Sequence, residues 1–229
     1  MKPVKLSVIV PAYNEERTIK QVLHVLLTQK EVKQVVIVDD CSTDGTSALV
    51  NNVKDKRIIL IRHKKNMGKG AAIRTGLDHV TGTHVLIQDA DMEYDPREIP
   101  TLLDPIKAGR ADVVFGSRFY GAHTNMFYWH LVGNKLLNFV VNILYDTTLS
   151  DMETCYKVVP TALMRELNLT ERDFRIEPEI TCKLLKRGAK ILEVPITYVG
   201  RTYAEGKKIT WKDGIKAVRT IVRLRAFSH

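Results

Sequence analysis

The sequence has little of what marks a membrane-spanning, secreted or disulfide-bonded protein. No apolar run reaches the ~20 residues that a transmembrane helix needs. The most apolar segment, 127–145, is interrupted by the polar residues His130, Asn134, Lys135, Asn138 and Asn142. The first residues have too short an apolar run for a secretory signal. The three cysteines are an odd number and lack Cys-x-x-Cys spacing, which argues against a disulfide framework and a zinc site. We therefore expect a cytoplasmic protein.

Two common nucleotide-binding motifs are also missing. No Gly-x-Gly-x-x-Gly follows the first apolar run, which argues against NAD or FAD. The glycine-rich turn at 66–70 lacks the spacing of a Walker P-loop and has Gly70 where that loop needs Ser or Thr. Aromatic residues make up only 7% of the chain, which argues against a surface on which nucleic-acid bases stack. We therefore expect no nucleic-acid partner.

Positive charge is abundant and concentrated at the end of the chain. The net charge is +9, and residues 201–229 contain eight Lys or Arg against two acids, a net +6. Such a segment favours an anionic partner. Over 211–227 an apolar stripe (Trp211, Ile215, Val218, Val222) recurs at helical spacing, with basic residues one position later. This predicts either a membrane-surface helix or a helix packed on the domain with a solvated basic face.

Apolar runs and helical patterns alternate along the first half of the chain. Short Val- and Ile-rich runs predict buried strands at 6–11, 35–40, 58–63, 84–89 and 112–116. Helical patterns lie between them at 15–29, 43–53 and 69–80. The second half predicts helices at 125–145 and 178–187 and strands at 155–160 and 191–199. We therefore expect an α/β fold with a mostly parallel central sheet and helices on both faces.

Ligands of such sheets bind outside the carboxyl ends of the strands, and here those ends are polar. Asp89 and Asp91 follow the fourth run, one residue apart, with Glu93 nearby. Two hard oxygen ligands at this spacing can share Mg²⁺ or Mn²⁺ with phosphate oxygens. Carboxylates are common in loops, so the spacing alone is weak, and its place after a strand is what predicts a metal site.

Two further segments suggest contacts to a nucleotide. Asp39 and Asp40 close the second run; helix capping by the residues that follow explains part of this segment, but not two adjacent acids. The carboxylates could accept hydrogen bonds from a base or a ribose hydroxyl. The turn at 66–70, which contains Lys69, precedes a helix and could bind an anion.

Together these segments resemble a known family. The segments 8–16, 35–46, 66–76 and 88–96 look like the signature segments of family 2 glycosyltransferases of the GT-A fold. The segments 115–119, 150–160, 175–188 and 201–215 resemble the branch of dolichyl-phosphate mannosyltransferases and polyprenyl-phosphate glucosyltransferases. The resemblance runs almost end to end. It implies a Rossmann-like GT-A catalytic domain at 1–200 and a basic extension at 201–229 with a phosphate-closing loop and an amphipathic helix.

The resemblance also implies roles for individual residues. Those expected at the nucleotide sugar are Pro11, Tyr13, Glu15, Asp40, Lys69, Asp89, Arg201 and Lys207. Asp89, Asp91 and Glu93 are expected at the metal, and Asp91, Arg118 and Glu153 at the reacting groups.

The implied reaction is an inverting transfer of a hexose from a GDP-mannose or UDP-glucose type of donor to a polyprenyl or dolichyl phosphate. With a hydroxyl acceptor, Asp151 or Glu153 must instead take a proton. A membrane surface or membrane protein is a further expected partner, placing the chain peripherally on the cytoplasmic membrane face. The alternatives are a non-catalytic nucleotide-sugar binder and a sugar nucleotidyltransferase. The latter normally has a glycine-rich, arginine-containing loop where this chain has PAYNEE.

Overall fold

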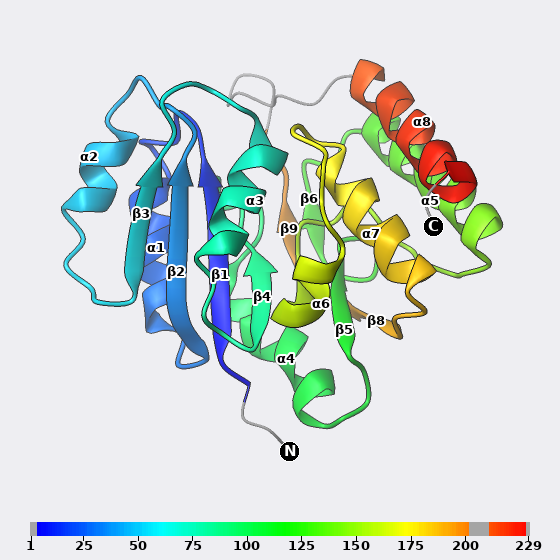
Figure 1. Cartoon of the computed structure of the whole chain (residues 1–229), viewed down its shortest axis with the longest axis horizontal. Coiled ribbons are helices and arrows are strands. Elements are labelled where there is room, and N and C mark those ends of the chain that lie inside the picture. The colour runs from blue at the N-terminus through cyan, green and yellow to red at the C-terminus, as the bar shows by residue number, and fades with distance from the viewer. Residues whose placement is uncertain (1–3, 202–210, 228–229) are drawn as a thin grey trace.

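The computed structural model describes residues 4–201 and 211–227, and its centre is a seven-stranded sheet (Figure 1). The strand order is β3-β2-β1-β4-β7-β5-β8. These strands are β1 (Leu6–Ala12), β2 (Val32–Asp39), β3 (Ile58–Arg62), β4 (His84–Ile87), β5 (Val113–Ser117), β7 (Lys157–Pro160) and β8 (Ile191–Pro195). A separate parallel pair joins β6 (His123–Thr124) to β9 (Tyr198–Val199). The predicted strand at 191–199 is therefore two strands in two sheets.

The sheet is mostly parallel, as predicted, with one exception. β3, β2, β1 and β4 pair in parallel, and so do β5 and β8. β7 lies between these two groups and runs antiparallel to both β4 and β5. The carboxyl ends of β1, β2, β4 and β5 thus share one edge of the sheet, where the predicted polar residues lie.

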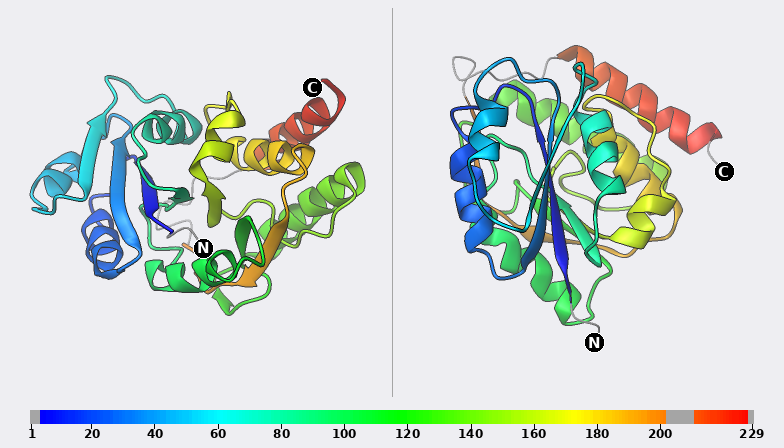
Figure 2. Two further views of the ribbon diagram at one scale, coloured as in Figure 1. Left: turned by 60° about the horizontal axis from the view of Figure 1, so that its bottom comes forward. Right: turned by 60° about the vertical axis from the view of Figure 1, so that its left-hand side comes forward.

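Helices cover both faces of the sheet (Figure 2). Those of the first half are α1 (Ile19–Thr28), α2 (Thr46–Asn51), α3 (Lys69–Asp78) and α4 (Ile99–Lys107), the last preceded by the 3-10 turn η1 (Pro96–Glu98). Those of the second half are α5 (Tyr128–Tyr145), α6 (Thr161–Glu166), α7 (Ile176–Lys186) and α8 (Trp211–Phe227). The sequence patterns did not predict α4 or α6. α2 begins at Thr46, three residues later than predicted.

The core explains why the strands are continuous Val and Ile runs. Six of the seven residues of β1 are buried, because helices cover both faces of a parallel sheet. At Gly76, on α3, an added Cβ would lie 2.6 Å from the side chain of Ile9 in β1. α3 therefore packs close to the sheet, and its first residue lies near the ends of β1 and β4.

The last helix packs on the domain through a face other than its predicted apolar stripe. Ala217, Thr220, Ile221 and Leu224 are buried, where α8 contacts α5 and α7. Ile215 and Val222 of the predicted stripe are instead about half exposed. Within the described part of the chain, no helix is both long and apolar enough to cross a membrane.

Candidate active site

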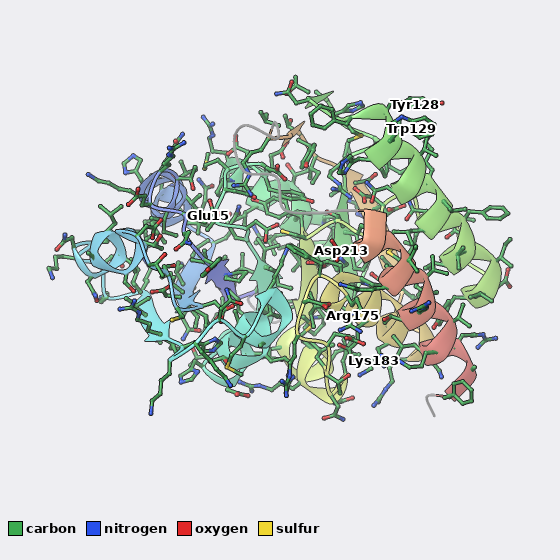
Figure 3. The ribbon with its side chains drawn as sticks, turned by 90° about the horizontal axis from the view of Figure 1, so that it is seen from above. Glu15, Tyr128, Trp129, Arg175, Lys183 and Asp213 are labelled. Carbon is green, nitrogen blue, oxygen red and sulfur yellow. The ribbon has the colours of Figure 1, made fainter. Side chains whose placement is uncertain are left out.

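One cavity of about 880 Å³ lies at the carboxyl edge of the sheet. Every predicted site residue that the structure describes lines it: Pro11, Tyr13, Glu15, Asp40, Lys69, Asp89, Asp91, Glu93, Arg118, Glu153 and Arg201. Lys207 lies outside the described residues. In Figure 3, Glu15 lies on the side of β1, and Arg175 and Asp213 lie toward α7 and α8; all three line the cavity. The sheet edge therefore gathers residues that are far apart in the sequence.

Asp89 forms an ion pair with the first residue of α3. Lys69 Nζ lies 2.7 Å from Asp89 Oδ1 and 3.3 Å from Glu177 Oε1. Burial alone would lower the pKa of Lys69, but the charges of Asp89 and Glu177 outweigh it and raise that pKa. Burial likewise raises the pKa of Asp89, but Lys69 lowers it further, so Asp89 is ionised. Lys69 is thus a fixed cation beside the acid pair.

Asp91 lies in a cluster of like charges that Arg201 only partly offsets. Burial and the nearby carboxylates of Asp89 and Glu93 raise the pKa of Asp91 to about 7. Arg201 Nη2 lies 2.6 Å from Asp91 Oδ2, and Nη1 lies 3.3 Å from Glu15 Oε2. Arg201 therefore connects the loop after β4 to the loop after β1.

The acid pair suits a hard divalent cation, although the described residues hold no ready-made metal site. No group of three or more His, Cys, Asp or Glu among residues 4–201 and 211–227 is arranged to hold an ion. Glu93 accepts hydrogen bonds from the Tyr198 hydroxyl and the Arg201 backbone N–H, both at 2.8 Å. The carboxylates of Asp89 and Asp91 remain the oxygen donors that Mg²⁺ and Mn²⁺ prefer. The raised pKa of Asp91 shows that this cluster lacks positive charge.

The two acids that end β2 have different partners. Asp39 is fully buried and accepts a hydrogen bond from the Ser42 N–H at 2.8 Å, so it shapes the following turn. Asp40 lines the cavity and accepts hydrogen bonds from the backbone N–H groups of Met67 and Gly68, at 2.8 and 2.7 Å. Asp40 thus holds the glycine-rich turn in place, and its predicted contact with the nucleoside stays a prediction.

Arg118, just beyond β5, is held by Asp151. Its Nε and Nη2 each donate to the Asp151 carboxylate at 2.7 Å, and its backbone N–H donates at 2.9 Å. Glu193 in turn accepts the backbone N–H groups of Ser150 and Asp151, at 2.8 and 3.0 Å. Because Asp151 is committed to Arg118, it is poorly suited to remove a proton from an acceptor. Arg118 is rigidly presented to the cavity.

Glu153 is the least satisfied acid of the site. Its Oε1 is buried and has no hydrogen-bond partner among the described residues. Burial raises the pKa of Glu153 to about 7; Lys157 opposes this rise, and Glu177 adds to it. A carboxyl group that titrates near neutral pH can donate or accept a proton.

Sequence reasoning missed several cavity residues. Lys157 Nζ lies 2.6 Å from Glu177 Oε2, and this buried pair borders Lys69 and Glu153. A lysine opening the apolar strand Lys157–Pro160 was the available signal. The apolar wall between α5 and α8 was also missed; it includes Trp129, Leu136 and Val218. Only packing brings these two helices together, so no local pattern predicts this wall.

Comparison with known proteins places this geometry in a family. Residues 7–167 match the family model described as glycosyl transferase family 2. The glycosyltransferase AglJ of Haloferax volcanii is 30% identical over 204 residues, covering 87% of this chain but only 64% of AglJ. An uncharacterised protein of Methanocaldococcus jannaschii is 28% identical over 235 residues, covering 94% and 96% of the two chains.

Solved structures share the fold at low sequence identity. Glucosyl-3-phosphoglycerate synthase of Mycobacterium tuberculosis, in complex with Mn²⁺, UDP-glucose and phosphoglyceric acid, superposes with a TM-score of 0.73 at 20% identity. The match covers 99% of this chain and 81% of that one. TarS of S. aureus, in complex with UDP-GlcNAc, gives a TM-score of 0.67 at 23% identity, covering 98% and 68%. The fold predicted from the sequence is therefore confirmed.

Proposed function

The chain belongs to glycosyltransferase family 2, and on that premise we propose that it transfers a hexose from a GDP- or UDP-linked donor to a polyprenyl or dolichyl phosphate, with inversion. One observation carries the proposal: a single cavity joins an acid pair and fixed cations at the sheet edge to an apolar wall between α5 and α8. Such a cavity suits a charged donor at one end and a lipid-linked acceptor at the other.

In this proposal the nucleotide lies along Pro11, Tyr13, Glu15 and Asp40, and the diphosphate lies near Lys69. Mg²⁺ or Mn²⁺ held by Asp89 and Asp91, with Glu93, would neutralise the charge that develops on the departing nucleoside diphosphate. Lys69 already places a positive charge beside Asp89. Arg201, together with Lys207, would bind phosphate oxygens. Arg201 pairs with Asp91, so it is within reach of the donor's charged end.

The acceptor would meet Arg118 and the apolar wall. A lipid phosphate is already anionic, so it needs positioning rather than a base to remove its proton. Arg118 is fixed by Asp151 and lines the cavity, which suits it to hold a phosphate oxygen. The polyprenyl chain would lie along Trp129, Leu136 and Val218.

A hydroxyl acceptor, as in polysaccharide or glycolipid synthesis, is the second candidate because of Glu153. Its unpartnered Oε1 and its pKa of about 7 suit a general base that takes the hydroxyl proton. A non-catalytic nucleotide-sugar binder ranks below both.

The test is a screen of UDP- and GDP-hexoses with Mn²⁺ or Mg²⁺ and a short polyprenyl phosphate, with products identified by mass spectrometry. We expect a glycosyl polyprenyl phosphate and release of the nucleoside diphosphate. Transfer to sugar hydroxyls without any transfer to polyprenyl phosphate would favour the second candidate. Stoichiometric donor binding without turnover on either acceptor would favour the binder.

A further inference from the structure

The outer face of α5 is an apolar row that no other described element covers. Tyr128, Trp129, Val132, Leu136, Phe139 and Ile143 are spaced by three or four residues beyond the first pair, so they share one side of the helix. Their exposed fractions run from 38% at Val132 to 78% at Trp129. α5 buries its opposite side through Leu137, Asn138 and Val141. Contiguous exposed apolar rows of this kind mark interaction surfaces.

α8 packs against α5 and adds apolar and cationic groups. Tyr145, at the end of α5, donates a hydrogen bond to the Ile221 carbonyl, and the Arg225 guanidinium lies 5.6 Å from the Tyr145 ring centre. Ile215 and Val222 are about half exposed, and Arg219 lies on the same helix. No acid of the described ranges 4–201 and 211–227 forms an ion pair with Arg219.

A shallow recess of about 150 Å³ borders this basic side of α8. It is lined by Arg175, Lys216, Arg219, Thr220 and Arg223. Nearby acids partly offset its charge, since Arg223 pairs with Glu171 and Arg175 with Asp173. The lining itself contributes four cations and no acid, so it suits an anionic headgroup.

The active-site cavity reaches the same two helices. Trp129 and Leu136 both line the cavity and belong to the exposed row of α5, and Ile215 does the same on α8. Figure 3 shows Tyr128 and Trp129 at the outer end of α5, with Asp213 at the start of the neighbouring α8. The cavity therefore borders the outer surface of both helices.

We propose that this surface, the outer face of α5 together with Ile215, Arg219 and Val222 of α8, docks on an anionic lipid bilayer. The apolar row would enter the interfacial region, where Tyr and Trp are favoured, and the cations of α8 would meet lipid phosphates. The face stands on its own geometry; only the delivery of a lipid acceptor from the bilayer to the cavity rests on the proposed function.

Charge and access favour a bilayer over a second copy of this chain. α5 contains no acidic residue, so its exposed row offers a second copy no partner for the cations of α8. A protein seated on Trp129 and Leu136 would also cover the rim of the cavity. A fluid bilayer covers the same side chains and leaves a route for a lipid-linked molecule.

The test is flotation of the full chain with phosphatidylcholine vesicles, with and without phosphatidylglycerol. The variants are Phe139→Ser/Ile143→Ser, which removes exposed apolar groups outside the cavity lining, and Arg219→Glu. Matched controls are Tyr120→Ser, an exposed aromatic residue off both helices, and Lys56→Glu. Thermal unfolding and calorimetric binding of UDP and GDP show that each variant is folded and has an intact donor site.

We expect the unaltered chain to float only with phosphatidylglycerol vesicles, and less so as salt rises. The double serine variant should partition about 10- to 100-fold more weakly, Arg219→Glu about tenfold more weakly, and both controls as the unaltered chain. No flotation at low salt, or full flotation of the double serine variant, would overturn the proposal. A dimer that the double serine variant dissolves, without flotation, would assign the face to a second copy. Transfer to a detergent-dispersed polyprenyl phosphate without any flotation would refute the docking face while leaving the proposed function standing.

Discussion

Replacing Glu153 with Gln keeps the shape of the side chain and removes its ionisation. In the donor-free protein, burial raises the pKa of Glu153 from 4.5 to about 7. In the unfolded chain this carboxyl ionises near pH 4.5, whereas in the folded chain it ionises only near pH 7. Ionised Glu153 therefore costs stability, and the cost grows between these two pH values. At about 1.4 kcal/mol per pKa unit, the full cost is about 3 kcal/mol.

The expected stability result has a defined sign. Glu153→Gln should become more stable relative to the unaltered protein as pH rises from about 4.5 to 7, by up to about 3 kcal/mol, with no further gain above that. Urea denaturation at about pH 5 and about pH 8 measures this difference. Glu166→Gln, at an exposed acid, is the matched control and should show little change. A difference between Glu153→Gln and the unaltered protein that does not depend on pH would refute the account of Glu153 as an unpaired, desolvated acid.

The same variant separates the two acceptor classes. A lipid-phosphate acceptor needs no base, so transfer to polyprenyl phosphate should fall by less than about tenfold, because a general base contributes about 10²–10⁴ in rate only where a proton must be removed. A hydroxyl acceptor should instead lose about 10²–10⁴ in kcat, together with the dependence of kcat on an ionisation near pH 7. A loss of that second size with polyprenyl phosphate would contradict the proposed role of Arg118 as sufficient to position the acceptor.

Three further changes test other parts of the site. Asp91→Ala should lower transfer by about 10²–10³, since it removes an electrostatic contact at the leaving diphosphate; activity that survives both this change and EDTA would contradict the metal assignment. Asp151→Ala leaves the Arg118 guanidinium buried without its partner and should destabilise the fold by about 3–5 kcal/mol in urea denaturation; an unchanged midpoint would show that another group replaces the carboxylate. Gly68→Ala should cost more stability than Gly109→Ala, because both positions have positive φ but the new Cβ at Gly68 would lie 2.4 Å from the Arg172 carbonyl oxygen, whereas the one at Gly109 meets nothing within 4 Å; equal thermal shifts would count against a tight turn at Gly68.

Without a donor, the site balances its acids with its own cations. Lys69 pairs with Asp89, Arg201 with Asp91, and Lys157 with Glu177. Removing one member of such a buried pair leaves an uncompensated charge. Substitutions in this network should therefore be judged by stability as well as by activity.

Some of this organisation follows from local sequence. Buried parallel strands need continuous Val and Ile runs, so β1 and β2 were predicted from composition alone. Polar residues that follow such strands must lie at one edge of the sheet, so the strand pattern alone brings Asp89 and Asp91 to the same cavity as Glu15 and Asp40. The helical spacing at 211–227 likewise predicted α8.

Other features depend on contacts between distant segments, which no local pattern encodes. The antiparallel direction of β7 depends on which strands it enters between. The buried face of α8 depends on α5 and α7, so Ala217 and Leu224 pack inward while Val222 stays outside. The pKa of Glu153 depends on burial and on Lys157 and Glu177 across the cavity. The sequence by itself therefore determined the strands and the edge where chemistry gathers, because both depend on short-range patterns; tertiary packing alone decided which charges are paired and which apolar surfaces remain exposed.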